Sequence, residues 1–306
     1  MEHREKIRII DVGPRDGFQN VKPLIDTQTK LFIIEGLYQS GIRTMEVTSF
    51  VSPKAIPQMA DAAEVAKAVI GRYKDLRAIA LIPNLKGAQN AWNAGIREAA
   101  CVISVSEAHN KANINRTVKE SLDALEGIRE ALPDLEVHLD AATAFGCPFA
   151  GEVPKEAVLS LIGSAQQWGS RKGTLCDTIG VADPAQVKEL LGEVTGRYPG
   201  LELTLHFHNT RGMGLANIFA AAEMGIRNFE TSVGGLGGCP FAPGADGNTA
   251  TEDTVHMLEK MGFDTGIDLA KLLGVVEYVD RHIDAPVTGK MLGVTNSACA
   301  DISGRA

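Results

Sequence analysis

Two histidines separated by one residue are the first candidates for chemistry in this sequence. His206 and His208 lie at the end of an apolar run, 201–207, that is typical of a β-strand. Side chains at positions i and i+2 of a strand point to the same side, so both imidazoles face inward if either does. A single strand histidine is usually a packed core residue, but two converging imidazoles cannot easily both be charged. Their spacing therefore favours a divalent cation as their partner.

A second group of charged side chains follows the first apolar run of the chain. The segment GPRDGFQN at 13–20 places the guanidinium of Arg15 beside the carboxylate of Asp16. Taken alone, this composition is typical of a surface turn with an incidental ion pair. Two further carboxylates, Glu46 and Asp177, lie within apolar runs and can face inward. A buried carboxylate needs a partner, and a cation or an arginine would provide one.

The third candidate region is a glycine-rich segment around one thiol. Residues 234–248 read GGLGGCPFAPGADGN, with six glycines and two prolines around Cys239. Such a loop can close over a site, and this setting favours a chemical role for the thiol. At the end of the segment, Asn248 could cap the next helix or, equally, bind a cation through its amide oxygen. We expect Glu252 to form a capping box with Thr249.

A regular alternation of apolar runs and amphipathic segments must position these residues. Eight runs rich in Val and Ile recur along the chain, and each is followed by a segment with helical spacing. The runs span residues 7–12, 44–50, 77–82, 100–105, 136–144, 174–179, 201–207 and 228–233. Eight such units fit a closed barrel better than an open sheet, and the phosphate-binding glycine pattern of a doubly wound sheet is missing. We predict an α/β fold, a (β/α)8 TIM barrel, whose chemistry lies at the carboxyl ends of the strands.

The domain organisation follows from the length and the spacing of these runs. We predict that residues 1–306 form a single domain, with the barrel at about 7–262. A C-terminal helical extension is expected at about 266–283. This extra helix would pack across the barrel or against another subunit, as in a homodimer.

Composition limits the partners and the compartment. The chain has 30 basic and 38 acidic residues, a net charge of −8, so we expect no binding to nucleic acid or to an anionic membrane surface. We find no apolar stretch that approaches the length of a membrane-spanning helix. The five cysteines are odd in number and include no Cys-x-x-Cys pair, which argues against disulfides and a zinc site. We therefore expect a cytoplasmic protein.

Six segments, taken in order, resemble a known enzyme family. They are VGPRDGFQN, VTSFVSPKAIPQMAD, IPNLKG, DTIGVADP, HFHNTRG and GGLGGCPFAPGADGNTATED. Over about residues 7–282 the chain is similar to 3-hydroxy-3-methylglutaryl-CoA lyase, a metal-dependent TIM-barrel lyase related to the Claisen-type synthases. The cysteine loop is the part specific to the lyase. The resemblance implies an enzyme that cleaves a carbon-carbon bond of a 3-hydroxyacyl-CoA, giving an acyl-CoA and a keto product.

The resemblance also implies roles for individual residues. One divalent cation, Mg²⁺ or Mn²⁺, would have four protein ligands, namely Asp16, His206, His208 and Asn248. Arg15 would stabilise the developing enolate oxygen, and Cys239 would supply a proton to the enolate carbon. We further expect Glu46 and Asp177 to be catalytic, Gln19 to contact the substrate and Glu252 to support the site.

Departures from the family pattern fall where the substrate would bind. The family's His-x-His-Asp-Thr-Tyr-Gly-Gln is here HFHNTRGM, which introduces Arg211, and the family's glycine before Asp-Thr is Cys176. Asp140 replaces a tyrosine if the segment Gly146-Cys147-Pro148 fixes the register. We expect Asp140 and Arg211 to contact the acyl group and alter its charge environment, so that 3-hydroxy-3-methylglutaryl-CoA is a poor substrate.

Two other functions fit parts of this pattern. A Claisen-type synthase would run related chemistry in the condensing direction, but the cysteine loop and the expected absence of a regulatory C-terminal domain favour the lyase. A catalytically silent metal-binding barrel would not need Arg15 beside an intact set of metal ligands.

Overall fold

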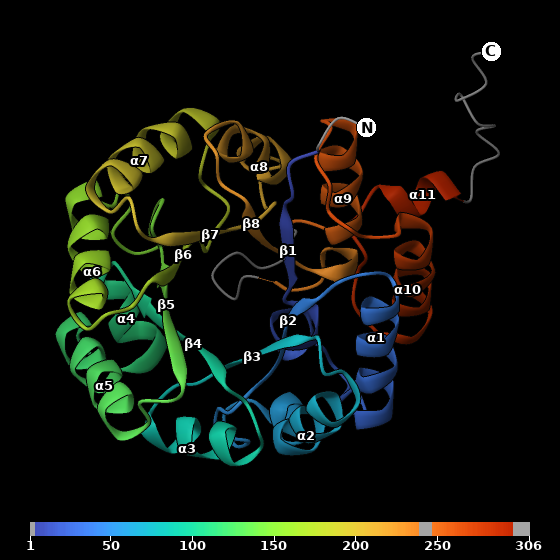
Figure 1. Ribbon diagram of the computed structural model, residues 1–306, viewed down its shortest axis with the longest axis horizontal. Coiled ribbons are helices and arrows are strands. Elements are labelled where there is room, and N and C mark those ends of the chain that lie inside the picture. The colour runs from blue at the N-terminus through green and yellow to red at the C-terminus, as the bar shows by residue number, and fades with distance from the viewer. Residues whose placement is uncertain (1–3, 239–246, 296–306) are drawn as a thin grey trace.

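Eight parallel strands pair in chain order and close into a barrel (Figure 1). The computed structural model describes residues 4–238 and 247–295. The strands are β1 (Arg8–Asp11), β2 (Thr44–Ser49), β3 (Arg77–Leu81), β4 (Glu98–Ser104), β5 (Glu136–Ala142), β6 (Lys172–Asp177), β7 (Glu202–Phe207) and β8 (Asn228–Thr231). Closure is made by β1 and β8, which pair from Arg8 with Asn228 to Asp11 with Thr231. This arrangement confirms the predicted (β/α)8 barrel.

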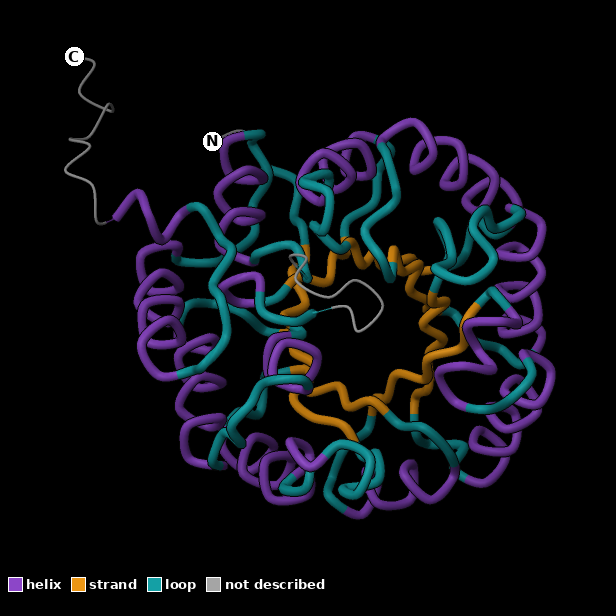
Figure 2. The backbone as a smooth tube through the Cα atoms, turned by 180° about the vertical axis from the view of Figure 1, so that it is seen from behind, coloured by secondary structure: helices purple, strands orange, loops and turns teal. Residues whose placement is uncertain are grey.

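Helices form an outer ring around the strands (Figure 2). They are α1 (Thr27–Gln39), α2 (Ala62–Arg72), α3 (Leu85–Asn93), α4 (Glu107–Ile114), α5 (Val118–Ala131), α6 (Lys155–Gln167), α7 (Pro184–Arg197), α8 (Gly214–Glu223), α9 (Thr251–Lys260), α10 (Leu269–His282) and α11 (Met291–Thr295). Short turns are η1 (Gly13–Gly17), which is π-helical, and the 3₁₀ turns η2 (Pro57–Met59) and η3 (Val233–Gly235). The described helices include none that is long and apolar enough to cross a membrane.

Helix α1 illustrates why these segments become helical. Leu31, Ile34 and Leu37 recur at the spacing of one helix face, and all three are buried. The side chain of Asp26 accepts a hydrogen bond from the backbone N–H of Thr29 at 3.0 Å and so caps the first turn. The apolar face therefore lies against the barrel while the opposite face remains in solvent.

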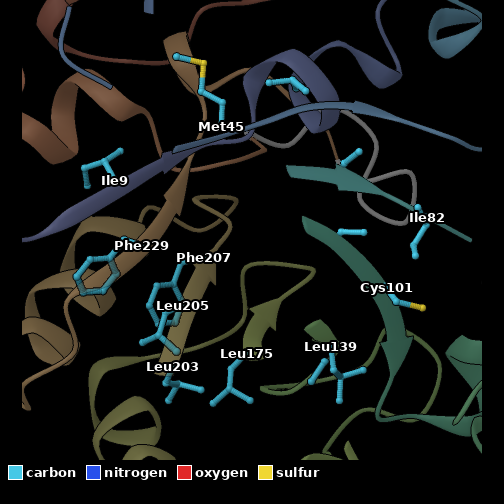
Figure 3. Packing of buried hydrophobic residues seen from close by; sticks show 14 of the residues in the cluster. Ile9, Met45, Ile82, Cys101, Leu139, Leu175, Leu203, Leu205, Phe207 and Phe229 are labelled. Atoms are coloured by element: carbon cyan, nitrogen blue, oxygen red, sulfur yellow. The ribbon is translucent and has the colours of Figure 1, made fainter. Parts of the chain in front are cut away.

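The main hydrophobic core lies between the strands and the helices (Figure 3). Leu205, Phe207 and Phe229 on neighbouring strands are buried in this layer. Side chains alternate along a strand, so the residues between them point into the barrel. Among the described residues, the second apolar cluster is small and consists of Ile10, Val12, Ile79 and Ala100. Much of the remaining barrel interior is available to polar side chains, and it is there that the site is built.

The helical extension predicted at about 266–283 is observed as α10, which begins three residues later and ends at His282. Asp268 caps it by accepting from the N–H groups of Ala270 and Lys271. Helix α10 packs against α1 and α9 of its own chain rather than across the barrel, and packing against another subunit stays a prediction. An ideal Cβ on Gly36 of α1 would lie only 2.7 Å from Cγ2 of Val275 on α10. Gly36, in the middle of α1, therefore allows the two helices to approach each other closely.

Candidate active site

A cavity of about 320 Å³ opens at the carboxyl ends of the strands. Its lining includes Arg15 and Asp16 after β1, Asp140 on β5 and His206 on β7. In TIM barrels this is the end where loops bring reactive groups together. The predicted Gln19 also lines the cavity, next to the η1 turn.

Asp16, His206 and His208 converge as a potential cation site. One ligand atom from each of the three lies within 4.8 Å of the others, and the two imidazole centroids are 5.1 Å apart. Nδ1 of His206 lies 3.0 Å from Oε2 of Glu230, which leaves Nε2 for another partner. Nδ1 of His208 is buried without a hydrogen-bond partner among the described residues. The arrangement has the features of a metal centre whose histidine is oriented by a carboxylate.

Asn248 joins this cluster from the far end of the sequence. Its backbone forms a bridge with His208, and its Nδ2 donates to Oδ2 of Asp16 at 2.7 Å and to the carbonyl of Leu236 at 3.0 Å. Its Oδ1 is buried and has no donor in the described part of the chain. At Gly237, where φ is +113°, a Cβ would collide with this amide. Of the two roles considered for Asn248, helix capping is therefore wrong, because α9 is preceded by Ala250 instead.

Arg15 is buried between two carboxylates. Its side chain donates from Nε to Oε2 of Glu46 at 2.5 Å and from Nη1 to Oδ1 of Asp16 at 2.6 Å. Only 9% of the residue is exposed, so the alternative of an incidental surface ion pair is wrong. The π-helical turn that follows β1 produces this geometry, because the N–H groups of Arg15 and Asp16 both bond to the carbonyl of Val12.

Burial and neighbouring charges set the ionisation of these groups. Burial raises the pKa of Glu46 to about 7, although the charge of Arg15 opposes the shift. Burial also acts to raise the pKa of Asp16, but Arg15 and the two histidines outweigh it and hold that pKa at about 2. Burial, reinforced by His206, lowers the pKa of His208 to about 3. Asp16 is therefore an anion and His208 a neutral imidazole, the forms that bind a metal.

Two of the predicted site residues, Asp177 and Arg211, are not among the residues that line the cavity. Both carboxylate oxygens of Asp177 accept backbone hydrogen bonds, from Val181 at 2.9 Å and from Ala182 at 3.0 Å. The guanidinium of Arg211 donates to the carbonyl of Ile179 at 2.7 Å. Both side chains thus brace the loop between β6 and α7. Loop N–H and C=O groups compete with a substrate for the same charged side chains, and the catalytic role of Asp177 and the substrate contact of Arg211 stay predictions.

Glu252 supports the site in a different way from that predicted. Its Oε2 accepts from the N–H of Gly234 at 3.0 Å, while Thr249 donates to the carbonyl of Phe207 at 2.8 Å. Helix α9 is preceded by Ala250, which makes no side-chain cap. The predicted capping box is therefore wrong, because each member of the pair has a tertiary partner instead.

The cysteines have three different settings. Cys239 falls in 239–246, outside the described residues, whereas the preceding Gly238 lines the cavity. Cys101 and Cys147 are buried free thiols, as the sequence indicates. Cys176 lines the cavity, and burial raises its pKa well above the usual range.

Two ionisable cavity residues, Glu230 and His109, were not singled out from the sequence. Glu230 occupies an inward position of β8, and a charged residue in mid-strand was a usable signal for it. His109 on α4 lines the cavity with its Nδ1 2.6 Å from Oγ of Ser104. Burial lowers the pKa of His109, so its imidazole is neutral. No pattern in the sequence distinguishes it from a helix-surface histidine.

Comparison with known proteins gives a consistent result across the chain. The family model described as HMGL-like matches residues 6–279. The hydroxymethylglutaryl-CoA lyase YngG of Bacillus subtilis is 43% identical over 300 residues, covering 97% of this chain and all of that protein. The (R)-citramalyl-CoA lyase of Chloroflexus aurantiacus is 40% identical over 92% of this chain and 93% of its own length.

A solved structure supports the same relationship. It is that of an HMG-CoA lyase from Acinetobacter baumannii in complex with coenzyme A and 3-methylmalate. The TM-score is 0.91 at 40% sequence identity, with 97% of each chain covered. Similarity of this extent includes the barrel.

Proposed function

Since this chain belongs to the HMGL-like family, we propose that it is a carbon-carbon lyase that cleaves a 3-hydroxyacyl-CoA into an acyl-CoA and a keto product. The observation that carries the proposal is the convergence of Asp16, His206 and His208 with Arg15 at one cavity. Relatives named as lyases of hydroxymethylglutaryl-CoA and citramalyl-CoA act on the same class of thioester.

A divalent cation, Mg²⁺ or Mn²⁺, fits the proposed ligands. Asp16, His206, His208 and Asn248 offer one carboxylate, two imidazoles and one amide oxygen. The fit is supported by the buried Oδ1 of Asn248 and Nδ1 of His208, which lack partners among the described residues. When bound, such a cation would act as a Lewis acid that lowers the pKa of the substrate hydroxyl.

Arg15 is the residue we assign to the developing negative charge. Breaking the bond between C2 and C3 leaves an electron pair on the departing acyl thioester, as an enolate. A guanidinium has five N–H donors, and Glu46 and Asp16 engage two of them at Nε and Nη1. The remaining donors are available to the enolate oxygen. Glu46 acts as a positioning residue, because it fixes the plane of the guanidinium.

The reaction needs two proton transfers, one from the substrate hydroxyl and one to the enolate carbon. The hydroxyl proton needs an acceptor, and the carboxylate of Glu230 lines the cavity. The enolate carbon needs a donor, and we assign that role to Cys239, which follows the cavity residue Gly238 in the chain. Gln19, also at the cavity, is assigned to substrate binding.

The proposal is tested by incubating the purified chain with branched 3-hydroxyacyl-CoA thioesters and Mg²⁺. Release of the short acyl-CoA is followed by chromatography, before and after removal of metal by a chelator. We expect metal-dependent cleavage that is lost in His208→Ala and kept in His282→Ala, an exposed histidine on α10. Condensation of an acyl-CoA with a keto compound, without cleavage, would assign the chain to the synthases instead.

A further inference from the structure

The lining of the cavity includes a buried acidic side chain, Asp140, that has a hydrogen bond with Thr174 but only for one of its two carboxyl oxygens. Asp140 on β5 lines the cavity and is only 4% exposed. Its Oδ1 has no hydrogen-bond partner in the described part of the chain. Nε2 of His138, two residues earlier on the strand, is 3.7 Å away, beyond the range of a hydrogen bond. A buried carboxyl oxygen without a donor costs free energy that a ligand can recover.

The cations around this carboxyl already have carboxylate partners. Arg15 is bonded to Glu46 and Asp16, and His206 to Glu230. Behind Asp140, Nδ1 of His138 faces Glu98 at 3.6 Å, and Glu98 is paired with Arg77.

The described lining of the cavity has one arginine, Arg15, and no lysine. Its wall also carries His109, whose imidazole is neutral because burial lowers its pKa. Among the described lining residues, a negatively charged acyl substituent would therefore find no basic side chain that is not already paired with a carboxylate.

Hydrogen-bonding capacity separates two kinds of acyl group. An ionised carboxylate accepts hydrogen bonds and donates none, whereas a hydroxyl donates one. Burial, with the nearby charge of Glu230, raises the pKa of Asp140 to about 7, so its ionised form predominates at about pH 8. A second carboxylate there would be repelled and would leave Oδ1 of Asp140 without a donor.

We propose that Asp140 makes this enzyme select an acyl group with an uncharged, hydrogen-bond-donating end, such as a primary alcohol, over one that ends in a carboxylate. The inference rests on the proposed lyase function. The reaction is unchanged: C3 loses its hydroxyl proton and becomes a ketone, the C2–C3 bond breaks, and C2 of the departing thioester gains a proton. With a hydroxymethyl end, the products are acetyl-CoA and a hydroxyketone.

Two thioesters with one carbon skeleton test this selectivity. They are 3-hydroxy-3-methylglutaryl-CoA, which ends in a carboxylate, and 3,5-dihydroxy-3-methylpentanoyl-CoA, which ends in a primary alcohol. kcat/KM is measured for both with Mg²⁺ at pH 8 by the release of acetyl-CoA. We expect the alcohol to be preferred by about tenfold or more, the scale of one unsatisfied buried hydrogen bond.

Matched variants then assign the preference to Asp140. Asp140→Asn removes the charge at nearly constant size, so it should raise kcat/KM for the carboxylate thioester and bring the ratio close to one. The control is Glu136→Gln, which removes one charge from the same strand at the opposite end of the barrel, where the side chain is 52% exposed. It should leave the ratio unchanged. Asp140→Ser serves as a second variant if the asparagine variant does not fold.

The outcomes separate the two proposals. An equal or higher kcat/KM for the carboxylate thioester in the natural protein would overturn the selectivity and still support the lyase function. A ratio that stays the same in folded Asp140→Asn would also overturn it, since other residues would then make the choice. If neither thioester, nor any other 3-hydroxyacyl-CoA, is cleaved with metal present, both proposals fail together.

Discussion

Arg15 meets two carboxylates before any substrate is bound, and its planar shape is what lets it do so. Lysine is a point charge and cannot bond Glu46 and Asp16 while also facing an enolate oxygen. We predict that Arg15→Lys lowers kcat by about 10²-fold or more with little change in KM, as for loss of a transition-state donor. Steady-state kinetics measures both constants.

Arg77→Lys is the matched control, because Arg77 also pairs with a buried glutamate but lies outside the described cavity lining. It should leave kcat nearly unchanged. An effect of Arg15→Lys on KM alone would show that Arg15 anchors the substrate rather than stabilising charge.

Glu230 orients a proposed metal ligand without being one itself. Its Oε2 is 3.0 Å from Nδ1 of His206, which directs Nε2 toward Asp16 and His208. We predict that Glu230→Gln weakens Mn²⁺ binding by about 10- to 100-fold, the usual cost of losing such a partner. Isothermal titration calorimetry measures the affinity. Glu202→Gln, at the start of β7, should bind Mn²⁺ normally, and equal affinities in the two variants would contradict this role.

The sequence predicted those parts of the site whose positions are determined by strand geometry. The spacing of His206 and His208 fixes a common face, so their convergence follows from the sequence. Asp177 was predicted as an inward-facing carboxylate of a strand and Arg211 from its departure from the family motif, and the charged ends of both bond to loop backbone. Sequence alone does not show which backbone groups a loop leaves unpaired, and this determines where such side chains point.

Among the elements, α1 and α10 make a contact that tolerates little added volume. Gly36 faces Val275 with no room for a Cβ. We predict that Gly36→Val lowers the free energy of unfolding by about 1 to 3 kcal/mol through overpacking, and that adding Val275→Ala recovers part of it. Thermal and urea denaturation measure both.

The control substitution is Gly127→Val on α5, where a Cβ would meet nothing within 4 Å. It carries the same change of helix propensity without the contact. If the two single variants are equally stable, close packing of α1 and α10 is not the reason for Gly36.

The elements themselves were largely predictable. All eight strands lie within two residues of the predicted runs at their N-terminal ends, because apolar periodicity reports burial on the barrel. The start of α9 was not predictable, because Thr249 and Glu252 match the pattern of a capping box but bond to other parts of the fold. Local signals fail where a tertiary partner offers a competing hydrogen bond.

At the scale of the whole molecule, a bound cation would tie together segments that are distant in sequence. Asp16 follows β1, the histidines end β7, and Asn248 follows β8. Ligand binding to the folded state alone stabilises it by about 2.7 kcal/mol at a concentration of 100 times Kd. We predict that Mn²⁺ raises Tm by several degrees in the natural protein and not in His208→Ala. An equal rise in both proteins would mean that the ion stabilises the chain elsewhere.

Closure of the barrel by its first and last strands also sets an order in time. Asp16 and Asn248 are 232 positions apart, so at about 5 to 20 residues per second they leave the ribosome roughly 10 to 50 s apart. Until β8 emerges, Asp11 has no Thr231 to pair with, and the nascent barrel stays open. A chain that stops before Asn248 lacks the end of the segment that follows β8. It also lacks one proposed ligand, Asn248 itself. The full set of four proposed ligands therefore exists only after Asn248 has been synthesised.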